Sequence, residues 1–160
     1  MMKPFPYSLQ RWWQNMGFGI QSKTDYSFLK DVLREHLPYY IYDDLRKEYP
    51  QFSNKAHRQA QLLFRICYHF RNERILFVGH FNKLDRKAIE HAIPHKAEFT
   101  DAFYHKIVAN VIIMSGIYEE NIDRWFALTQ GNCITFDMVD LGIVISNEDR
   151  YPEHYKILRP

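Results

Sequence analysis

The 160-residue sequence has little cysteine, no closely spaced cysteine pair and no long apolar run. Its two cysteines, Cys67 and Cys133, lie far apart, which argues against a disulfide framework or a zinc site and favours a reducing cytoplasm. The first residues, MMKPFPYSLQRWW, contain no apolar signal core. The longest charge-free apolar run, Ile107 to Tyr118, falls short of the roughly 20 residues that a membrane helix requires. We therefore expect a cytoplasmic protein without a membrane partner.

The sequence also lacks an excess of charge of either sign. Its 21 basic and 19 acidic residues leave a formal net charge of +2, and the two kinds are intermixed along the chain. Nucleic-acid-binding domains typically gather basic residues on one face, so we expect no nucleic-acid partner. What the sequence has is apolar and aromatic residues, at 46% and 16%, which is enough to form a buried core.

The hydrophobic pattern divides the chain into residues 1–71 and residues 72–160. The first region predicts helices that form an N-terminal extension. Ser22 stands three residues before Asp25, which is a helix-start signature, and the helix that follows is expected to end by Pro38. A second helix is predicted from Lys55 to Phe70, because its apolar residues form a wide stripe. We expect the two regions to pack together as one unit.

The second region alternates strand and helix patterns. A strand is predicted at ILFVG from Ile75, a helix over Leu84 to Ile93 and a strand over Ile107 to Met114. A further helix is expected to turn Ile122, Trp125 and Phe126 inward. The segments CITFDM and LGIVIS are separated by only two residues, so they are predicted to form an antiparallel hairpin. The order predicts an α/β fold with a reduced, Rossmann-like sheet and an antiparallel edge.

Three segments carry a resemblance to a known family. They are GFGIQSKTDYSFLKDVL with PYYIYDDL, then RQAQLLFRICYHFRNERILFVG, and finally ITFDMVDLGIVISNEDRYPEHYKI. They resemble, in turn, the helical extension, the helix leading into the first strand and the closing hairpin of one branch of class I S-adenosylmethionine-dependent methyltransferases. The resemblance implies a cofactor cleft after the first strand, at Gly79 and His80, and after a later strand, at Ser115 and Gly116. It also implies that Tyr39 and Tyr40 lie near this cleft, although packing of the extension is the alternative role for both.

The sequence departs from that family where the cofactor would be held. The family's first strand ends in the style of ILEIGTSLG, with an acid and a glycine-rich loop. Here Phe77 takes the place of the acid, and Gly79 is followed by bulky residues that include His80 and Phe81. We expect these side chains to stand over the site. Each lost charge-assisted hydrogen bond weakens the binding free energy by roughly 1.5–3 kcal/mol. We therefore expect the affinity for the cofactor to be lost.

Two further acids of the family have no clear counterpart. The family's fourth strand ends like VFIDG, whereas VIIMSG places Ser115 there. The acid that would bind the cofactor ribose cannot be assigned, because the nearest choices, Glu98 and Asp101, follow no convincing strand. ILFVGHFN is therefore interpreted as the remains of a cofactor loop.

The favoured function is a non-catalytic, methyltransferase-like protein that acts as a binding, regulatory or oligomerisation module. It would have no catalytic residue, no cofactor and no metal, and its partner would be another protein or a second copy. The alternative is an S-adenosylmethionine-dependent methyltransferase of a small molecule with an atypical cofactor site. The remnant pocket in either case would consist of Gly79, His80, Ser115, Gly116, Tyr39 and Tyr40.

Two other patterns have competing interpretations. His91 and His95 have a helical metal-binding spacing, but Pro94 lies between them and no third ligand is evident, so we expect no metal site. Trp12 and Trp13 beside Arg11 suit stacking on nucleic acid, although burial against the protein body or a partner subunit is the more common fate of such residues.

Overall fold

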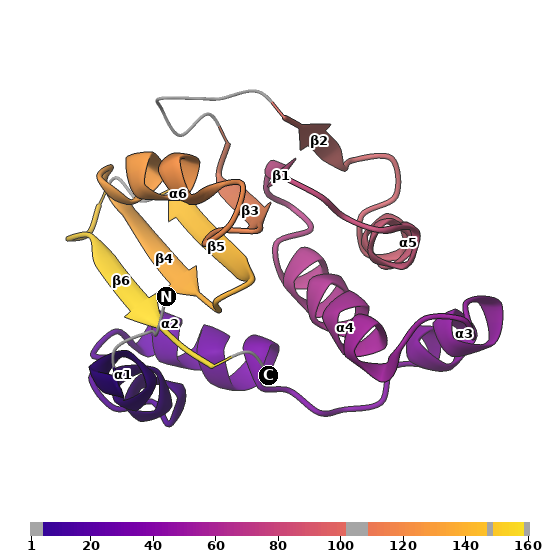
Figure 1. Ribbon diagram of the computed structural model, residues 1–160, viewed down its shortest axis with the longest axis horizontal. Helices are drawn as coiled ribbons and strands as arrows, with labels where there is room; N and C mark the ends of the chain where they lie inside the picture. Colours follow the sequence, from indigo (N-terminus) through magenta and orange to yellow (C-terminus); the bar gives the residue numbers. More distant parts are fainter. Residues whose placement is uncertain (1–4, 102–108, 147–148, 159–160) are drawn as a thin grey trace.

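The computed structural model describes residues 5–101, 109–146 and 149–158 (Figure 1). Over these residues the protein is an α/β fold built on one six-stranded mixed sheet with the strand order β2-β1-β3-β5-β4-β6. The strands are β1 (Ile75–Val78), β2 (Glu98–Thr100), β3 (Val111–Ser115), β4 (Cys133–Asp137), β5 (Leu141–Ser146) and β6 (Glu153–Lys156).

The N-terminal region is helical, as predicted, and two more helices follow among the strands. The helical elements are α1 (Phe5–Asn15), α2 (Lys23–Phe28), the π-helical segment η1 (Leu29–Leu33), α3 (Tyr40–Glu48), α4 (Asn54–His69), α5 (Lys83–Ala92) and α6 (Ile122–Thr129). Ser22 caps α2 by accepting a hydrogen bond from the Asp25 amide, which confirms the predicted start. None of the helices in the described residues has the length and apolar character needed to cross a bilayer.

The sheet confirms the predicted hairpin and corrects its position. β1 pairs in parallel with β2 and β3, whereas β5 is antiparallel to both of its neighbours, β3 and β4. The antiparallel strand therefore lies inside the sheet and not at an edge, so that part of the prediction was wrong. One edge of the sheet is β6, which pairs in parallel with β4 and was not predicted. An edge strand pairs on one side only, and the sequence EHYK of β6 carries no apolar run that would reveal it.

Two hydrophobic clusters cover the two faces of the sheet. One contains Phe77 and Phe136 together with apolar residues of α2, η1, α3, α4 and α5, so it joins the helical region to the sheet. The other packs Trp125 and Leu128 of α6 against the opposite face. Phe126 was expected to face inward, but its side chain is 51% exposed. The helix buries Trp125, as expected, together with Leu128, which lies three residues further along on the same side of the helix.

Two ion pairs attach the N-terminal helices to the last strands. Arg11 of α1 pairs with Asp137 of β4 at 2.8 Å, and both side chains are buried. Asp25 of α2 pairs with Arg150 at 2.6 Å and accepts a hydrogen bond from the Tyr155 hydroxyl. Burial and this hydrogen bond raise the pKa of Tyr155, so the hydroxyl remains protonated at neutral pH. Residues more than 120 positions apart are thus held together by one buried ion pair, Arg11–Asp137, and one partly buried pair, Asp25–Arg150.

Candidate functional site

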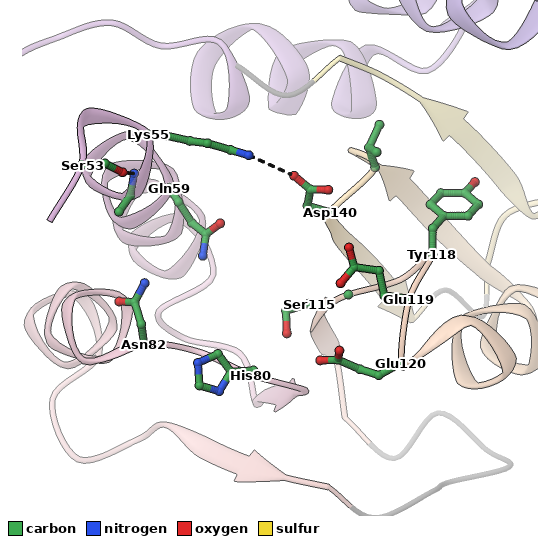
Figure 2. Close-up of a pocket in the computed structure, with 13 residues that line it drawn as sticks. Ser53, Lys55, Gln59, His80, Asn82, Ser115, Tyr118, Glu119, Glu120 and Asp140 are labelled. Atoms are coloured by element: carbon green, nitrogen blue, oxygen red, sulfur yellow. Dashed lines mark hydrogen bonds and ion pairs between the residues drawn. The ribbon is translucent and has the colours of Figure 1, made fainter. Parts of the chain in front are cut away.

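A cleft of about 870 Å³ opens at the carboxyl ends of β1 and β3 (Figure 2). The chain leaves β1 toward α5 on one face of the sheet and leaves β3 toward α6 on the other face. Two neighbouring strands whose connections diverge in this way leave a crevice between their loops, and open α/β sheets bind ligands at that point. The N-terminal turn of α4 and the β4–β5 turn at Val139 and Asp140 complete the walls.

The structure brings together four of the six residues predicted for the pocket. His80, Ser115 and Gly116 line the cleft, and Gly79 lines a smaller adjoining cavity of about 350 Å³ together with His80. Tyr39 and Tyr40 line neither cavity. The Tyr39 hydroxyl donates to Glu35 at 2.7 Å while its ring packs on α4, and Tyr40 is fully exposed.

The expectation that bulky side chains stand over the site was wrong for Phe77 and Phe81, whereas His80 does line the cleft. Phe77 and Phe81 are buried, and their ring centroids lie 4.9 and 6.0 Å from that of Phe99. Successive residues of a strand point to opposite faces, and Phe77 points to the face that α4 and α5 cover. The side chain of Phe81, just before α5 begins, packs in the same cluster. The cleft above the turn is consequently open.

The two glycines of the site allow the chain to pack against itself. Gly79 has φ +97°, and a Cβ atom placed there would lie 2.5 Å from Ser115 Oγ and 2.7 Å from Asn121 Nδ2. At Gly116, with φ +63°, a Cβ atom would lie 3.1 Å from the Glu120 carboxyl group. The side of each glycine on which a side chain would project is therefore occupied by residues of the same chain, and the loop after β1 rests directly on the loop after β3.

Asp101 occupies a position that the sequence did not predict. Glu98–Thr100 form β2, parallel to β1, so the expectation that Asp101 follows no strand was wrong, whereas Glu98 is itself the first residue of β2. Asp101 follows β2 directly and lines the smaller cavity with Gly79 and His80. Glu98 instead pairs with Arg74 at 2.8 Å, and this hydrogen bond lowers the pKa of Glu98. A three-residue strand that pairs through its backbone leaves too short a pattern in the sequence to be recognised.

Charged side chains face each other across the cleft. Lys55 of α4 reaches Asp140 of the β4–β5 turn at 4.0 Å, and Glu119 and Glu120 project from the loop after β3 (Figure 2). Three carboxylates against one ammonium group amount to a net charge of −2, in a chain whose formal net charge is +2. No pattern in the sequence predicts this set of charges, because its members come from three separate segments.

Nucleophilic chemistry at cysteine has no support in the structure. Cys67 and Cys133 are both buried, and burial raises both thiol pKa values, that of Cys133 to about 11. Both thiols are therefore protonated at neutral pH, when only the thiolate is nucleophilic. Among the described residues no three histidine, cysteine or acidic side chains gather in a way that could hold a metal ion. His95 instead lies 3.5 Å from Glu90 at the end of α5.

Comparison with known proteins gives no match, because no family model fits the chain and neither a curated protein nor a solved structure is significantly similar to it.

Proposed function

We propose that this protein is a non-catalytic, methyltransferase-like binding module whose cleft takes a small, positively charged molecule and rejects an adenosyl cofactor. The contacts of Gly79 and Gly116 carry this proposal. A cofactor loop uses glycine so that its backbone can approach the ligand closely. Here Ser115, Asn121 and Glu120 fill the side of each glycine on which a side chain would project, so that side offers no space to a nucleoside.

The sheet supports the methyltransferase-like, Rossmann-like part of the proposal. Strands β2, β1 and β3 are parallel, with β1 at the centre and the crevice between β1 and β3. An antiparallel strand, β5, follows in the second half of the sheet and forms a hairpin with β4. This arrangement agrees with the three sequence segments that resemble the methyltransferase branch, in a chain with few strands.

The charges of the cleft favour a cationic ligand. Glu119, Glu120 and Asp140 outnumber Lys55, whose side chain is 73% exposed and neutralises little of their field. A compact organic amine carries the charge that these side chains favour.

Calorimetric titration with S-adenosylmethionine and S-adenosylhomocysteine tests the rejection of the cofactor. We expect no saturable heat with either compound at concentrations up to about 1 mM, which corresponds to a binding free energy weaker than about −4 kcal/mol. The contacts of Gly79 are the physical reason, because Ser115 and Asn121 fill the space beside this glycine that the adenosyl group would need. Saturable binding in the micromolar range would overturn the proposed function.

Titration with 1,4-diaminobutane tests the ligand class, with 1,4-butanediol as the uncharged analogue. We expect binding of the diamine alone, and a roughly fivefold loss of affinity in Asp140→Asn or Glu120→Gln, since an exposed charge pair contributes about 1 kcal/mol. Glu73→Gln removes an exposed acid that does not line the cleft and should have no effect. Equal affinities in all variants, or no diamine binding, would reject a cationic ligand while leaving the rejection of adenosyl compounds intact.

The second candidate function is an S-adenosylmethionine-dependent methyltransferase with an atypical site. It is favoured by Asp101, whose position after β2 and beside Gly79 would suit contact with a ribose hydroxyl. The same calorimetry separates the two candidates. A methyltransferase would bind S-adenosylmethionine, and Asp101→Asn would weaken that binding.

A further inference from the structure

Helix α1 attaches to the protein through its polar side. Arg11 is buried, and besides its ion pair with Asp137 it donates hydrogen bonds to the carbonyl oxygens of Asp137 at 2.7 Å and Ile157 at 3.2 Å. The Gln14 side-chain oxygen accepts a hydrogen bond from the Lys156 amide at 2.6 Å. Figure 1 shows α1 at the outside of the molecule, beside β6 and α2. Polar groups therefore hold the inner side of this helix.

The outer side of α1 is apolar. Leu9, Trp12 and Trp13 follow the spacing i, i+3 and i+4, which places them on one face of the helix, and Met16 continues this spacing one residue after α1 ends. Their exposed fractions range from 47% for Met16 to 61% for Leu9, and Phe18, which packs on Trp13, is 49% exposed. These five residues form the α1 stripe. A surface helix normally buries its apolar face, whereas α1 buries its polar face and exposes its apolar face, an arrangement that we call inverted.

From this inverted arrangement we infer that the α1 stripe is a self-association surface covered by the α1 stripe of a second copy in a symmetric dimer. Arg11 is the single charged residue of α1, and it is buried against Asp137. Two copies of the stripe can therefore meet without repulsion between like charges. The spacing of the stripe is that of paired helices, and a surface that matches itself forms a twofold dimer. This inference concerns a surface outside the cleft and goes beyond the proposed function.

The size of the α1 stripe suits a dimer of moderate affinity. Large aromatic side chains bury roughly 150–250 Å² each, so five half-exposed residues offer on the order of 500 Å² per copy. A stable interface buries about 800 Å² per partner, with an apolar centre and a polar rim. The stripe supplies the centre, and Gln10 and Asn15 supply uncharged rim residues. We expect dissociation in the micromolar range.

A lipid surface fits the α1 stripe less well than a second copy. Helices that lie on membranes carry lysine and arginine on the polar face that points toward water and headgroups. The polar face of α1 points into the protein, and its one basic residue is already paired with Asp137. No charge remains on this helix to attract anionic lipid.

Sedimentation velocity of the full chain from about 1 to 200 µM tests the inference. We expect a monomer–dimer equilibrium that Trp12→Gln/Trp13→Gln shifts at least tenfold toward monomer, with an unchanged circular dichroism spectrum. Tyr40→Gln is the matched control, since Tyr40 is equally aromatic and 94% exposed away from α1. A monomeric wild type at 200 µM, or dimers that persist in the double variant, would overturn the inference.

Acrylamide quenching of tryptophan fluorescence provides a second readout on the unmodified protein. The chain has three tryptophans, and Trp125 is buried in the core, so a change in quenching with concentration reports on Trp12 and Trp13. We expect quenching to fall as the protein concentration rises through the dimerisation range. Quenching that does not change with protein concentration would contradict the dimer. In a separate vesicle flotation experiment, a monomeric protein that floats with phosphatidylcholine vesicles would show that the α1 stripe binds a lipid surface instead.

Discussion

Replacing Arg11 with alanine is expected to lower the free energy of unfolding by about 3–5 kcal/mol, since it leaves a buried carboxylate without its cationic partner. The Asp137 carboxylate still accepts hydrogen bonds from the Tyr118 hydroxyl and the Val139 amide, so the loss should fall near the lower limit. The variant also leaves the carbonyl oxygen of Ile157 without the Arg11 donor. Equilibrium unfolding in urea, monitored by circular dichroism, measures the difference.

The matched control for this prediction is Arg74→Ala. Arg74 makes two hydrogen bonds to the Glu98 carboxylate, but both side chains are about half exposed. An exposed pair of this kind contributes at most about 1 kcal/mol, because water replaces the lost partner. Equal losses for Arg11→Ala and Arg74→Ala would show that the Arg11–Asp137 pair is not buried in solution, and that α1 does not dock as described.

Substitutions at the contact between Gly142 and Trp125 are expected to have the second large effect on the free energy of unfolding. A Cβ atom at Gly142 would lie 2.3 Å from Trp125 Cζ3, so the α6 ring sits directly on the backbone of β5. We expect Trp125→Ala to cost about 3–5 kcal/mol by leaving a cavity. Gly142→Ala alone should cost about 1–3 kcal/mol through overpacking. Urea unfolding of the two single variants and the double variant measures these values.

The double variant discriminates steric overlap from a general loss of stability. With the Trp125 ring removed, the methyl group of Gly142→Ala fills part of the cavity, and alanine suits a strand better than glycine. Gly142→Ala should therefore be neutral or slightly stabilising in the Trp125→Ala background. The same cost in both backgrounds would mean that Gly142 is required for its backbone conformation and not for its contact with α6.

Local patterns in the sequence predicted the elements whose cause is local. The Ser22 cap, the strand at Ile75 and the β4–β5 hairpin each depend on residues within a few positions of one another. The helix predicted from Lys55 to Phe70 differs from α4 by one residue at each end. The strand predicted over Ile107 to Met114 begins at Val111, and its residues 107–108 lie outside the described part of the chain. The resemblance to methyltransferases stays a prediction.

The candidate site was predicted less well, because its parts meet only in three dimensions. The turn at Gly79 and the segment at Ser115 were recognised, since each follows an apolar run. Lys55, Glu119 and Asp140 were missed, because no spacing in the sequence relates them. Phe81 was placed over the cleft on the basis of its size, whereas its direction depends on the cluster formed with Phe77 and Phe99.

The sequence by itself determined the longer helices and the apolar strands, because periodic burial and capping act over a few residues, but it did not indicate the short strands β2 and β6. Only the tertiary structure decided where β5 and β6 enter the sheet, that the cleft is open and that its walls are net negative. It also decided that α1 faces outward with its apolar side. That orientation follows from Arg11, whose buried partner Asp137 lies 126 residues further along the chain, so no local pattern in the sequence could indicate it.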